Sequence, residues 1–401
     1  MSNPSLHNEW HGRLRDLAAQ DRLRSLKTIE PLPGHRVLSE KQILLNLASN
    51  DYLGLGCDLG LHEAFLAQLD ANQALAERGF TASASRLMSG NHPACSALEH
   101  MLEDAYGNGR RALILNSGYH ANLGILPALA RRGDLILSDR LNHASLIDGI
   151  RLSRANWRRY RHGDIEHLKT LLAAHRPRAG HRVFIVTESI FSMDGDCADL
   201  QALTEIKHTC DAVLFVDEAH AVGVRGKHGL GLCEEAGILP EVDILVGAFG
   251  KALASTGAFT MTTPLIRDML VNGMRPLMYT TALPPVILNW TRHVFQHGLE
   301  ARERRARLAE NTALFRRELA RANRPAPGSS HIVPLIVGAD NAATALAQRL
   351  RQAGYLVPPI RPPTVPAGTA RLRFSLCAGM QPCQLTELAA LAGRLQMEMS
   401  A

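Results

Sequence analysis

The sequence lacks any apolar stretch of the roughly 18 residues that a membrane-spanning helix requires. Its longest apolar runs, such as Val183–Val186 and Val213–Val216, have the length of strands. The first residues, MSNPSLHNEW, contain neither the basic nor the apolar region of a secretory signal. We therefore expect a cytoplasmic protein that has no membrane partner.

Aromatic residues are also scarce, at 5% of the 401 residues, and the seven cysteines include no C-x-x-C pair. The number and spacing of the cysteines are typical of reduced, buried thiols and predict neither a disulfide framework nor a metal site. Apolar residues nevertheless form 46% of the chain and charged residues only 20%, a composition that excludes a disordered protein. The length is enough for a large core and suggests two or three domains.

The formal net charge of +6 leaves nucleic acid, a membrane surface and an anionic small molecule open as partners. Arginines at 302–307 alternate with glutamates, as on a solvated helix face. A second basic cluster, at 157–161, is interleaved with a tryptophan and a tyrosine, and it keeps a phosphate-binding role open. We therefore expect a solvated surface at 302–307 and keep an anion-binding site open only at 157–161.

Nucleotide-binding motifs are missing. The segment Asp217–His220 reads DEAH, as in helicases, but neither Gly-Lys pair belongs to a G-x-x-x-x-G-K-[ST] phosphate loop. No G-x-G-x-x-G turn follows the first strand, as a nucleotide-dependent oxidoreductase would require. We therefore predict no nucleic-acid partner.

Between about 110 and 262, short aliphatic runs alternate with helical stretches. This alternation predicts an α/β fold with a mostly parallel sheet covered on both faces. Only the short Gly247–Gly257 loop separates the last two strands, so we expect one of them to be antiparallel. The runs expected as strands are Ala112–Leu115, Leu135–Leu137, Val183–Thr187, Val213–Val216, Ile244–Val246 and Ala258–Met261.

The flanking regions predict smaller elements. An amphipathic helix is expected in the first 35 residues, closed by Pro31 and Pro33, and a short strand at Leu44–Asn50. Pro284–Arg321 reads as one long helix that leads into a small α+β region. The predicted domains are an N-terminal segment (1–50), a large α/β domain (51–283) and a C-terminal α+β domain (284–401).

The chemistry is expected just after the strands, since ligands of open α/β sheets bind beyond the strands' carboxyl ends. Asp217 ends one strand, and Lys251 follows another within a small, apolar loop. A desolvated lysine can form a Schiff base, and a carboxylate can pair with a cationic ring nitrogen. Pyridoxal phosphate (PLP) needs both groups. The alternatives are a helix-capping aspartate and a surface lysine.

Three further positions fit a PLP site, although each also has a structural interpretation. Gly118 follows Ser117 at the expected start of a helix, where backbone N–H groups bind phosphate. His143 could stack on a planar ring, and Ser192 could donate to a ring oxygen. A helix cap, a structural histidine and a shaped turn would explain the same residues.

Five segments, in order, resemble the α-oxoamine synthases, which are fold type I PLP-dependent transferases. They are Ser49–Leu55, His143–Ser145, Ser192–Asp196, Asp217–His220 and Phe249–Lys251. The resemblance covers residues from about 15 to 395. It implies an acyltransferase with a large, mostly parallel seven-stranded-type sheet domain, a small C-terminal α+β domain, PLP as cofactor and a homodimer.

Within this family, the loop from Ile360 to Arg373 resembles the members that join L-alanine to a pimeloyl thioester. The pimeloyl group would be carried by coenzyme A or by acyl-carrier protein, and both stay open. Arg361 would offer a planar fork for a carboxylate. Another family member, such as a glycine C-acetyltransferase, is the alternative.

The resemblance also assigns roles to residues. Lys251 would carry the cofactor and move the α-proton, Asp217 would pair with the ring nitrogen, and His143 would stack on the ring. The remaining cofactor contacts implied are Gly118, Tyr119, Ser192, His220, Thr280 and Thr281. The implied substrate contacts are Arg24, Asn50, His143, Arg361 and Thr364.

Two departures from the family pattern stand out. Ala248 replaces a threonine or serine whose hydroxyl binds the cofactor phosphate, and Thr280 and Thr281 resemble a segment that reaches the neighbouring subunit's phosphate and could compensate. The stretch Thr81–Arg86 is bulkier than the glycine-rich segment of the family, which puts the acyl donor in doubt. The replacement at Ala248 also raises the alternative that the chain is a non-catalytic partner subunit. The intact Lys251 and Asp217 argue against that alternative.

Overall fold

The protein is described by a computed structural model covering residues 4–69 and 75–400. The chain divides into two compact units. The large unit comprises residues 53–192 and 196–306, and the small unit comprises residues 1–52, 193–195 and 307–401. The sequence-based division at 50 and 283 stays a prediction about domains.

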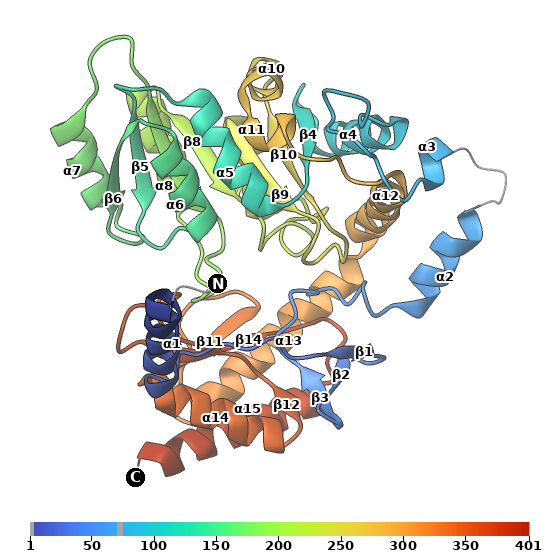
Figure 1. Cartoon of the computed structure of the whole chain (residues 1–401), viewed down its shortest axis with the longest axis vertical. Helices are drawn as coiled ribbons and strands as arrows, with labels where there is room; N and C mark the ends of the chain where they lie inside the picture. Colours follow the sequence, from blue (N-terminus) through green and yellow to red (C-terminus); the bar gives the residue numbers. More distant parts are fainter. Residues whose placement is uncertain (1–3, 70–74, 401) are drawn as a thin grey trace. The chain divides into compact units, whose positions relative to one another are not determined.

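A seven-stranded sheet forms the centre of the large unit (Figure 1). Strand β10 is antiparallel to both of its neighbours, and the other pairings are parallel. The expectation of a mostly parallel sheet with an antiparallel exception is therefore confirmed. In spatial order the strands are β4 (Arg111–Leu115), β10 (Ala258–Thr262), β9 (Ile244–Ala248), β8 (Val213–Asp217), β7 (Val183–Glu188), β5 (Leu135–Asp139) and β6 (Asn156–Tyr160).

Helices cover this sheet because its central strands are mostly apolar and are buried along their whole length. Helices α5 and α6 pack closely together, while α7 and α8 contact strands β5 to β8. The main helices of the large unit are α2 (Leu59–Gln68), α4 (Pro93–Tyr106), α5 (Gly118–Leu129), α6 (Ala144–Leu152), α7 (Ile165–His175), α8 (Leu200–Cys210), α10 (Pro264–Gly273) and α12 (Pro285–Glu300), with short helices α3 (Leu75–Arg78), α9 (Leu232–Glu235) and α11 (Arg275–Met278).

The prediction of one long helix over 284–321 is wrong. Helix α12 ends at Glu300, and α13 (Arg302–Arg321) begins after Ala301, whose ψ of 44° leaves the helical region. The guanidinium of the buried Arg305 donates to the carbonyls of Gly298 and Leu299, at 2.6 and 3.1 Å. These bonds satisfy carbonyls that a helix end leaves without partners.

The small unit contains two small sheets. Their strands are β1 (Glu30–Leu32), β2 (Arg36–Ser39), β3 (Gln42–Asn46) and β12 (Tyr355–Leu356) in one sheet, and β11 (Ile332–Gly338), β14 (Ala370–Ser375) and β13 (Pro359–Ile360) in the other. Helix α14 (Asp340–Gln352) packs on strands of both sheets and α15 (Pro382–Ser400) packs on α14, so the expected α+β composition is present. The strand expected at 44–50 begins and ends earlier, as β3.

The N-terminal helix α1 spans Pro4–Ala19, and the prolines at 31 and 33 do not end it as predicted. Asp21 adopts a left-handed φ of 54°, and the N–H groups of Arg22 and Leu23 donate to the Leu17 carbonyl. This turn closes the helix, and Leu23 therefore lies outside it. Among the described residues, no helix is both long and apolar enough to span a bilayer.

Candidate active site

Two carboxylates stand side by side at the carboxyl ends of adjacent strands. Glu188 ends β7 and Asp217 ends β8, and the parallel register pairs them directly. Both line a cavity of about 260 Å³ beyond the strand ends, together with Lys251 and His143. The structure therefore brings the predicted lysine and aspartate into one cavity.

Asp217 is buried and its two carboxylate oxygens are held by donors. Asn122 Nδ2 donates to Oδ2 at 2.6 Å, and the Ala219 N–H donates to Oδ1 at 2.9 Å. Asn122 is itself oriented by Ser145 Oγ, at 3.0 Å. The carboxylate is thus fixed before any ligand arrives, which is the preorganisation that a charge-pairing group requires.

Glu188 is fully buried and accepts a hydrogen bond from the His143 N–H at 2.5 Å. Burial, and then the neighbouring Asp217 carboxylate, raise the pKa of Glu188 to about 8, while Lys251 opposes the shift. Near neutral pH Glu188 is therefore mostly a neutral acid, and the strand-end pair avoids placing two charges together.

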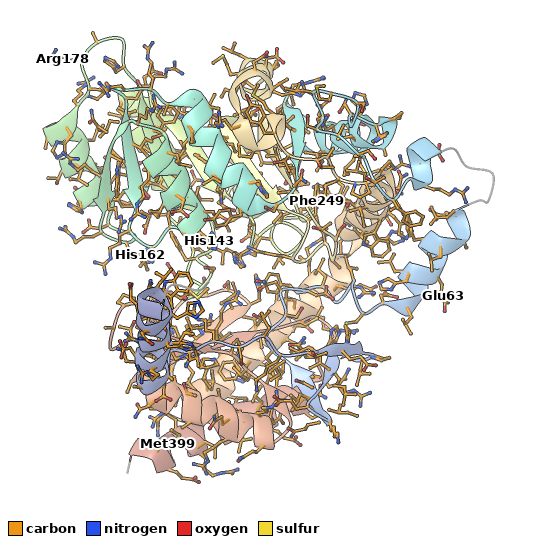
Figure 2. The ribbon with its side chains drawn as sticks, in the orientation of Figure 1. Glu63, His143, His162, Arg178, Phe249 and Met399 are labelled. Atoms are coloured by element: carbon orange, nitrogen blue, oxygen red, sulfur yellow. The ribbon has the colours of Figure 1, made fainter. Side chains whose placement is uncertain are left out.

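His143 begins helix α6 and its ring is fixed by Ser145, whose Oγ lies 2.7 Å from Nδ1. Burial lowers the pKa of His143. The Asp217 carboxylate acts to raise this pKa, and the Lys251 ammonium acts to lower it further. The neutral ring that results can stack on a planar ligand without adding charge to the cavity. Figure 2 labels His143 in the large unit.

The start of helix α5 forms another wall. Ser117 caps it by accepting from the His120 N–H at 3.2 Å, so the N–H groups of Gly118 and Tyr119 have no partner within the helix. A Cβ on Gly118 would lie 3.9 Å from the Cβ of Ala248. The departure at Ala248 therefore lies beside the helix terminus that would bind a phosphate.

Some of the predicted cofactor contacts line the cavity and others do not. Its lining includes Gly118, Tyr119, His143, Asp217, His220 and Lys251. Ser192, Thr280 and Thr281 are not among its lining residues. The Thr281 carbonyl accepts from Asn116 Nδ2 at 2.7 Å, and Thr281 also forms an isolated bridge with Ser85.

Sequence reasoning missed several polar residues of the cavity: Asn122, Ser145, Glu188 and Thr256. Asn122 lies inside an apolar helical stretch, and only the packing of α5 on α6 directs it to Asp217. In the sequence, Glu188 directly follows the expected strand Val183–Thr187, just as Asp217 follows Val213–Val216, and that position was the available signal. Glu218, next to Asp217, instead accepts from Ser189 Oγ at 2.5 Å and is structural.

His162, labelled in Figure 2, lies between two acidic side chains. Its Nδ1 lies 3.0 Å from Asp139 Oδ1 and its Nε2 lies 2.7 Å from Asp196 Oδ2. Burial alone would lower the pKa of His162, but the two carboxylates outweigh burial and raise it to about 10. A charged His162 therefore fixes the segment that carries Ser192 and Asp196.

Apart from His143, which lies in the large unit, the predicted substrate residues belong to the small unit. Arg24 Nη2 donates to Thr364 Oγ1 at 3.3 Å, and Arg361 Nη1 donates to Thr344 Oγ1 at 3.1 Å and to the Asp21 carbonyl. Asn50 is held separately: its Oδ1 accepts from Tyr52 OH at 2.9 Å and from Arg373 at 3.2 Å.

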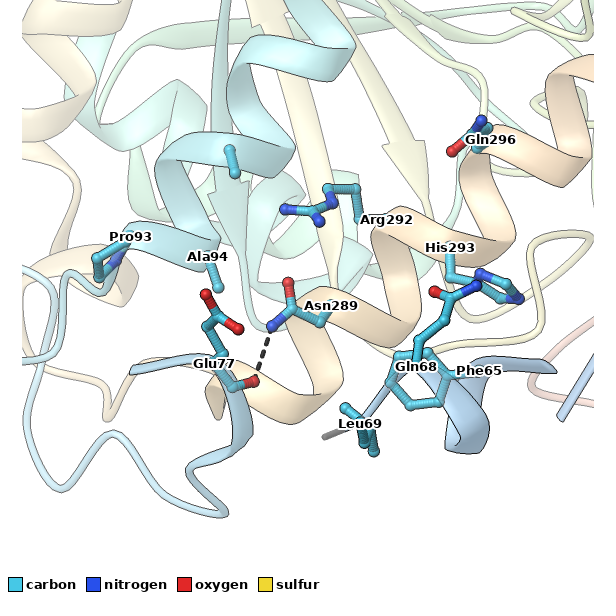
Figure 3. Close-up of a pocket in the computed structure, with 11 residues that line it drawn as sticks. Phe65, Gln68, Leu69, Glu77, Pro93, Ala94, Asn289, Arg292, His293 and Gln296 are labelled. Carbon is cyan, nitrogen blue, oxygen red and sulfur yellow. Dashed lines mark hydrogen bonds between the residues drawn. The ribbon is translucent and has the colours of Figure 1, made fainter. Parts of the chain in front are cut away.

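Another hollow of the large unit, of about 330 Å³, lies between α2, α4 and α12 (Figure 3). Arg292 and His293 of α12 border it, and Asn289 Nδ2 donates to the Glu77 carbonyl at 2.7 Å. It has none of the strand-end residues, and we assign it no chemistry.

Comparison with known proteins shows the family of the chain. Residues 42–391 match the aminotransferase class I and II family. An 8-amino-7-oxononanoate synthase from Chlorobaculum parvum is 51% identical over 376 residues, which cover 92% of this chain and 95% of that protein. The chain therefore belongs to the aminotransferase class I and II family, and the fold type I α/β architecture is confirmed.

Solved structures give the same picture. A serine palmitoyltransferase from S. paucimobilis, with bound PLP–myriocin aldimine, matches with a TM-score of 0.89 and 26% identity, with complete coverage of both chains. An 8-amino-7-oxononanoate synthase from Francisella tularensis matches with a TM-score of 0.75 and 29% identity, over 89% of this chain and 99% of that chain. Enzymes of this family are PLP-dependent.

The residues of the cavity fit PLP. A fixed carboxylate, a lysine and an unpartnered helix terminus line one hollow, which matches the ring nitrogen, aldehyde and phosphate of the cofactor. Asn122 Oδ1 is also buried there without a hydrogen-bond partner among the described residues. The donor set therefore supports PLP on structural grounds.

Replacing Asn122 with leucine should weaken cofactor binding. The change leaves a buried Asp217 oxygen without its donor, a loss of about 1–3 kcal/mol, so we expect the dissociation constant of PLP to rise about tenfold. Spectroscopic titration of the cofactor-free protein measures it. Thr204→Val, which removes a buried hydroxyl from α8, is the control, and an unchanged PLP affinity in Asn122→Leu would contradict this role.

His162→Gln should remove a pH-dependent stabilisation. The folded pKa of about 10 exceeds the unfolded value near 6.5, so the contribution is fully present below pH 6.5 and is lost as pH rises through 10. Urea unfolding at several pH values should show a wild-type advantage that shrinks between pH 7 and 10. His100→Gln, an exposed change on α4, serves as control. A difference that is constant with pH would refute the ion-pair account.

Proposed function

We propose that this chain catalyses the PLP-dependent decarboxylative condensation of L-alanine with a pimeloyl thioester, which yields 8-amino-7-oxononanoate for biotin synthesis. The observation that carries the proposal is the cavity in which Lys251 and the fixed Asp217 meet beside the start of α5. The similarity to 8-amino-7-oxononanoate synthases over nearly the whole chain supports this choice of reaction. A cytoplasmic location belongs to the proposal.

When bound, PLP supplies an aldehyde that an amine can attack and a protonated ring that accepts the electron pair left at the substrate's α-carbon. Asp217 keeps the ring nitrogen protonated through its own negative charge. Lys251 Nζ holds the cofactor and then takes and returns the α-proton. The N–H groups of Gly118 and Tyr119 bind the phosphate at the helix terminus.

The other residues orient the reactants. His143 offers a neutral ring face, while His220 and Ser192 bind the ring oxygen. Arg361 binds the alanine carboxylate through its planar guanidinium. We assign the remaining substrate contacts to Arg24, Asn50 and Thr364, and the partner subunit's phosphate to Thr280 and Thr281 in a homodimer.

Turnover with defined substrates tests the function. We expect CO2 and thiol release with L-alanine and pimeloyl-CoA, or with alanine and pimeloyl-acyl-carrier protein, and much slower release with glycine and acetyl-CoA. Lys251→Ala should lose the visible cofactor band and at least about 99.9% of turnover, because the covalent anchor and the proton carrier are the same amine. Faster turnover of glycine and acetyl-CoA would overturn the assignment.

Ala248→Thr should tighten cofactor retention. The new hydroxyl would lie beside the start of α5 and add one charge-assisted hydrogen bond to the phosphate, worth about 1–3 kcal/mol. The half-time of PLP loss on dialysis measures the effect. Ala248→Val has the same shape without the hydroxyl, so equal retention in the two variants would contradict the hydrogen-bond explanation.

A further inference from the structure

A third hollow of the large unit, of about 510 Å³, lies at the opposite end of the sheet from the candidate active site. It is lined by Leu135 and Asn156, the first residues of β5 and β6. The cavity described above is lined by Glu188 and Asp217, the last residues of β7 and β8. Because these strands are parallel, the two hollows are separate sites.

The lining of this third hollow is strongly basic. It includes Arg158, Arg176, Arg178, His175 and His181. Among the described residues that line it, none carries a carboxylate. Three permanent positive charges therefore surround the hollow.

The guanidinium groups are available. Within the described part of the chain, neither Arg176 nor Arg178 forms a side-chain hydrogen bond or an ion pair. Arg158 donates only to the carbonyl of its neighbour Trp157, at 2.9 Å. By contrast, arginines such as Arg225 are paired with carboxylates. The three guanidiniums therefore have no carboxylate partner, whereas the His181 ring lies 3.5 Å from the Asp134 carboxylate.

The wall that carries these groups is built around a buried acid. Asp134 Oδ1 accepts from the Arg182 N–H and its Oδ2 from the Arg131 N–H, both at 2.9 Å. Gly133, with φ 98°, leaves room for the His181 ring, because a Cβ there would lie 2.2 Å from it. Asp134 thus fixes the backbones of the two loops at Arg131 and Arg182, which border the hollow.

We propose that this hollow binds a compact, multiply charged, phosphate-bearing anion. The planar guanidinium matches phosphate oxygens in pairs, and three guanidiniums without carboxylate partners suit a ligand with two or more negative charges. A compact hollow favours a small anion over an extended polyanion. The basic cluster at 157–161 thereby gains a function through Arg158, and the site adds to the proposed reaction without taking part in it.

Calorimetric titration of the PLP-loaded enzyme with inorganic pyrophosphate tests the proposal. The cofactor occupies the catalytic cavity, so we expect one saturable site whose affinity falls as salt rises. Arg158→Gln/Arg178→Gln should weaken binding about tenfold or more, with unchanged circular dichroism. Arg302→Gln/Arg307→Gln removes the same charge from the solvated face of α13 and should change affinity less than about twofold.

Three results would overturn the proposal: no saturable binding of pyrophosphate, an equal loss in both double variants, or binding of heparin without binding of pyrophosphate. The second would mean that net charge alone attracts the anion. The third would mean that the surface serves an extended polyanion. Turnover of alanine with the pimeloyl thioester, measured on the same samples, separates a failure of this site from a failure of the proposed function.

Discussion

The site depends on the pairing of Glu188 with Asp217 across two parallel strands. Ionising both carboxyl groups would cost a large electrostatic free energy, since like charges in a buried site repel strongly. Burial and Asp217 raise the pKa of Glu188 to about 8, and the neutral acid still orders the His143 backbone. One negative charge remains to face Lys251 and a cationic ring.

Helix packing sets the position of that charge. A Cβ on Gly149 of α6 would lie 2.2 Å from the Asn122 carbonyl, so α6 approaches α5 closely only because this residue is glycine. The close approach brings Ser145 to Asn122, and Asn122 to Asp217. The same helix α5 presents Gly118 at its start. The carboxylate and the phosphate-binding terminus are therefore positioned by one packing contact.

Much of this could be predicted from the sequence, because some constraints are local. The short Gly247–Gly257 loop required an antiparallel strand, and β10 is one. The rule that ligands of open α/β sheets bind beyond the carboxyl ends of the strands identified Asp217 and Lys251. Asn122 could not be found, since its role depends on packing between helices. The break between α12 and α13 depends on Arg305 reaching carbonyls six and seven residues earlier, a contact that helical periodicity does not reveal.

The central claim is that the strand-end pair carries one negative charge at neutral pH. Infrared difference spectra of the cofactor-free protein, wild type against Glu188→Gln, test it most directly. We predict a protonated-carboxyl band at pH 7 that is absent from the variant and disappears in the wild type as pH passes about 8. Spectra without that band at pH 7, or a band that disappears near pH 4.5, would contradict the account.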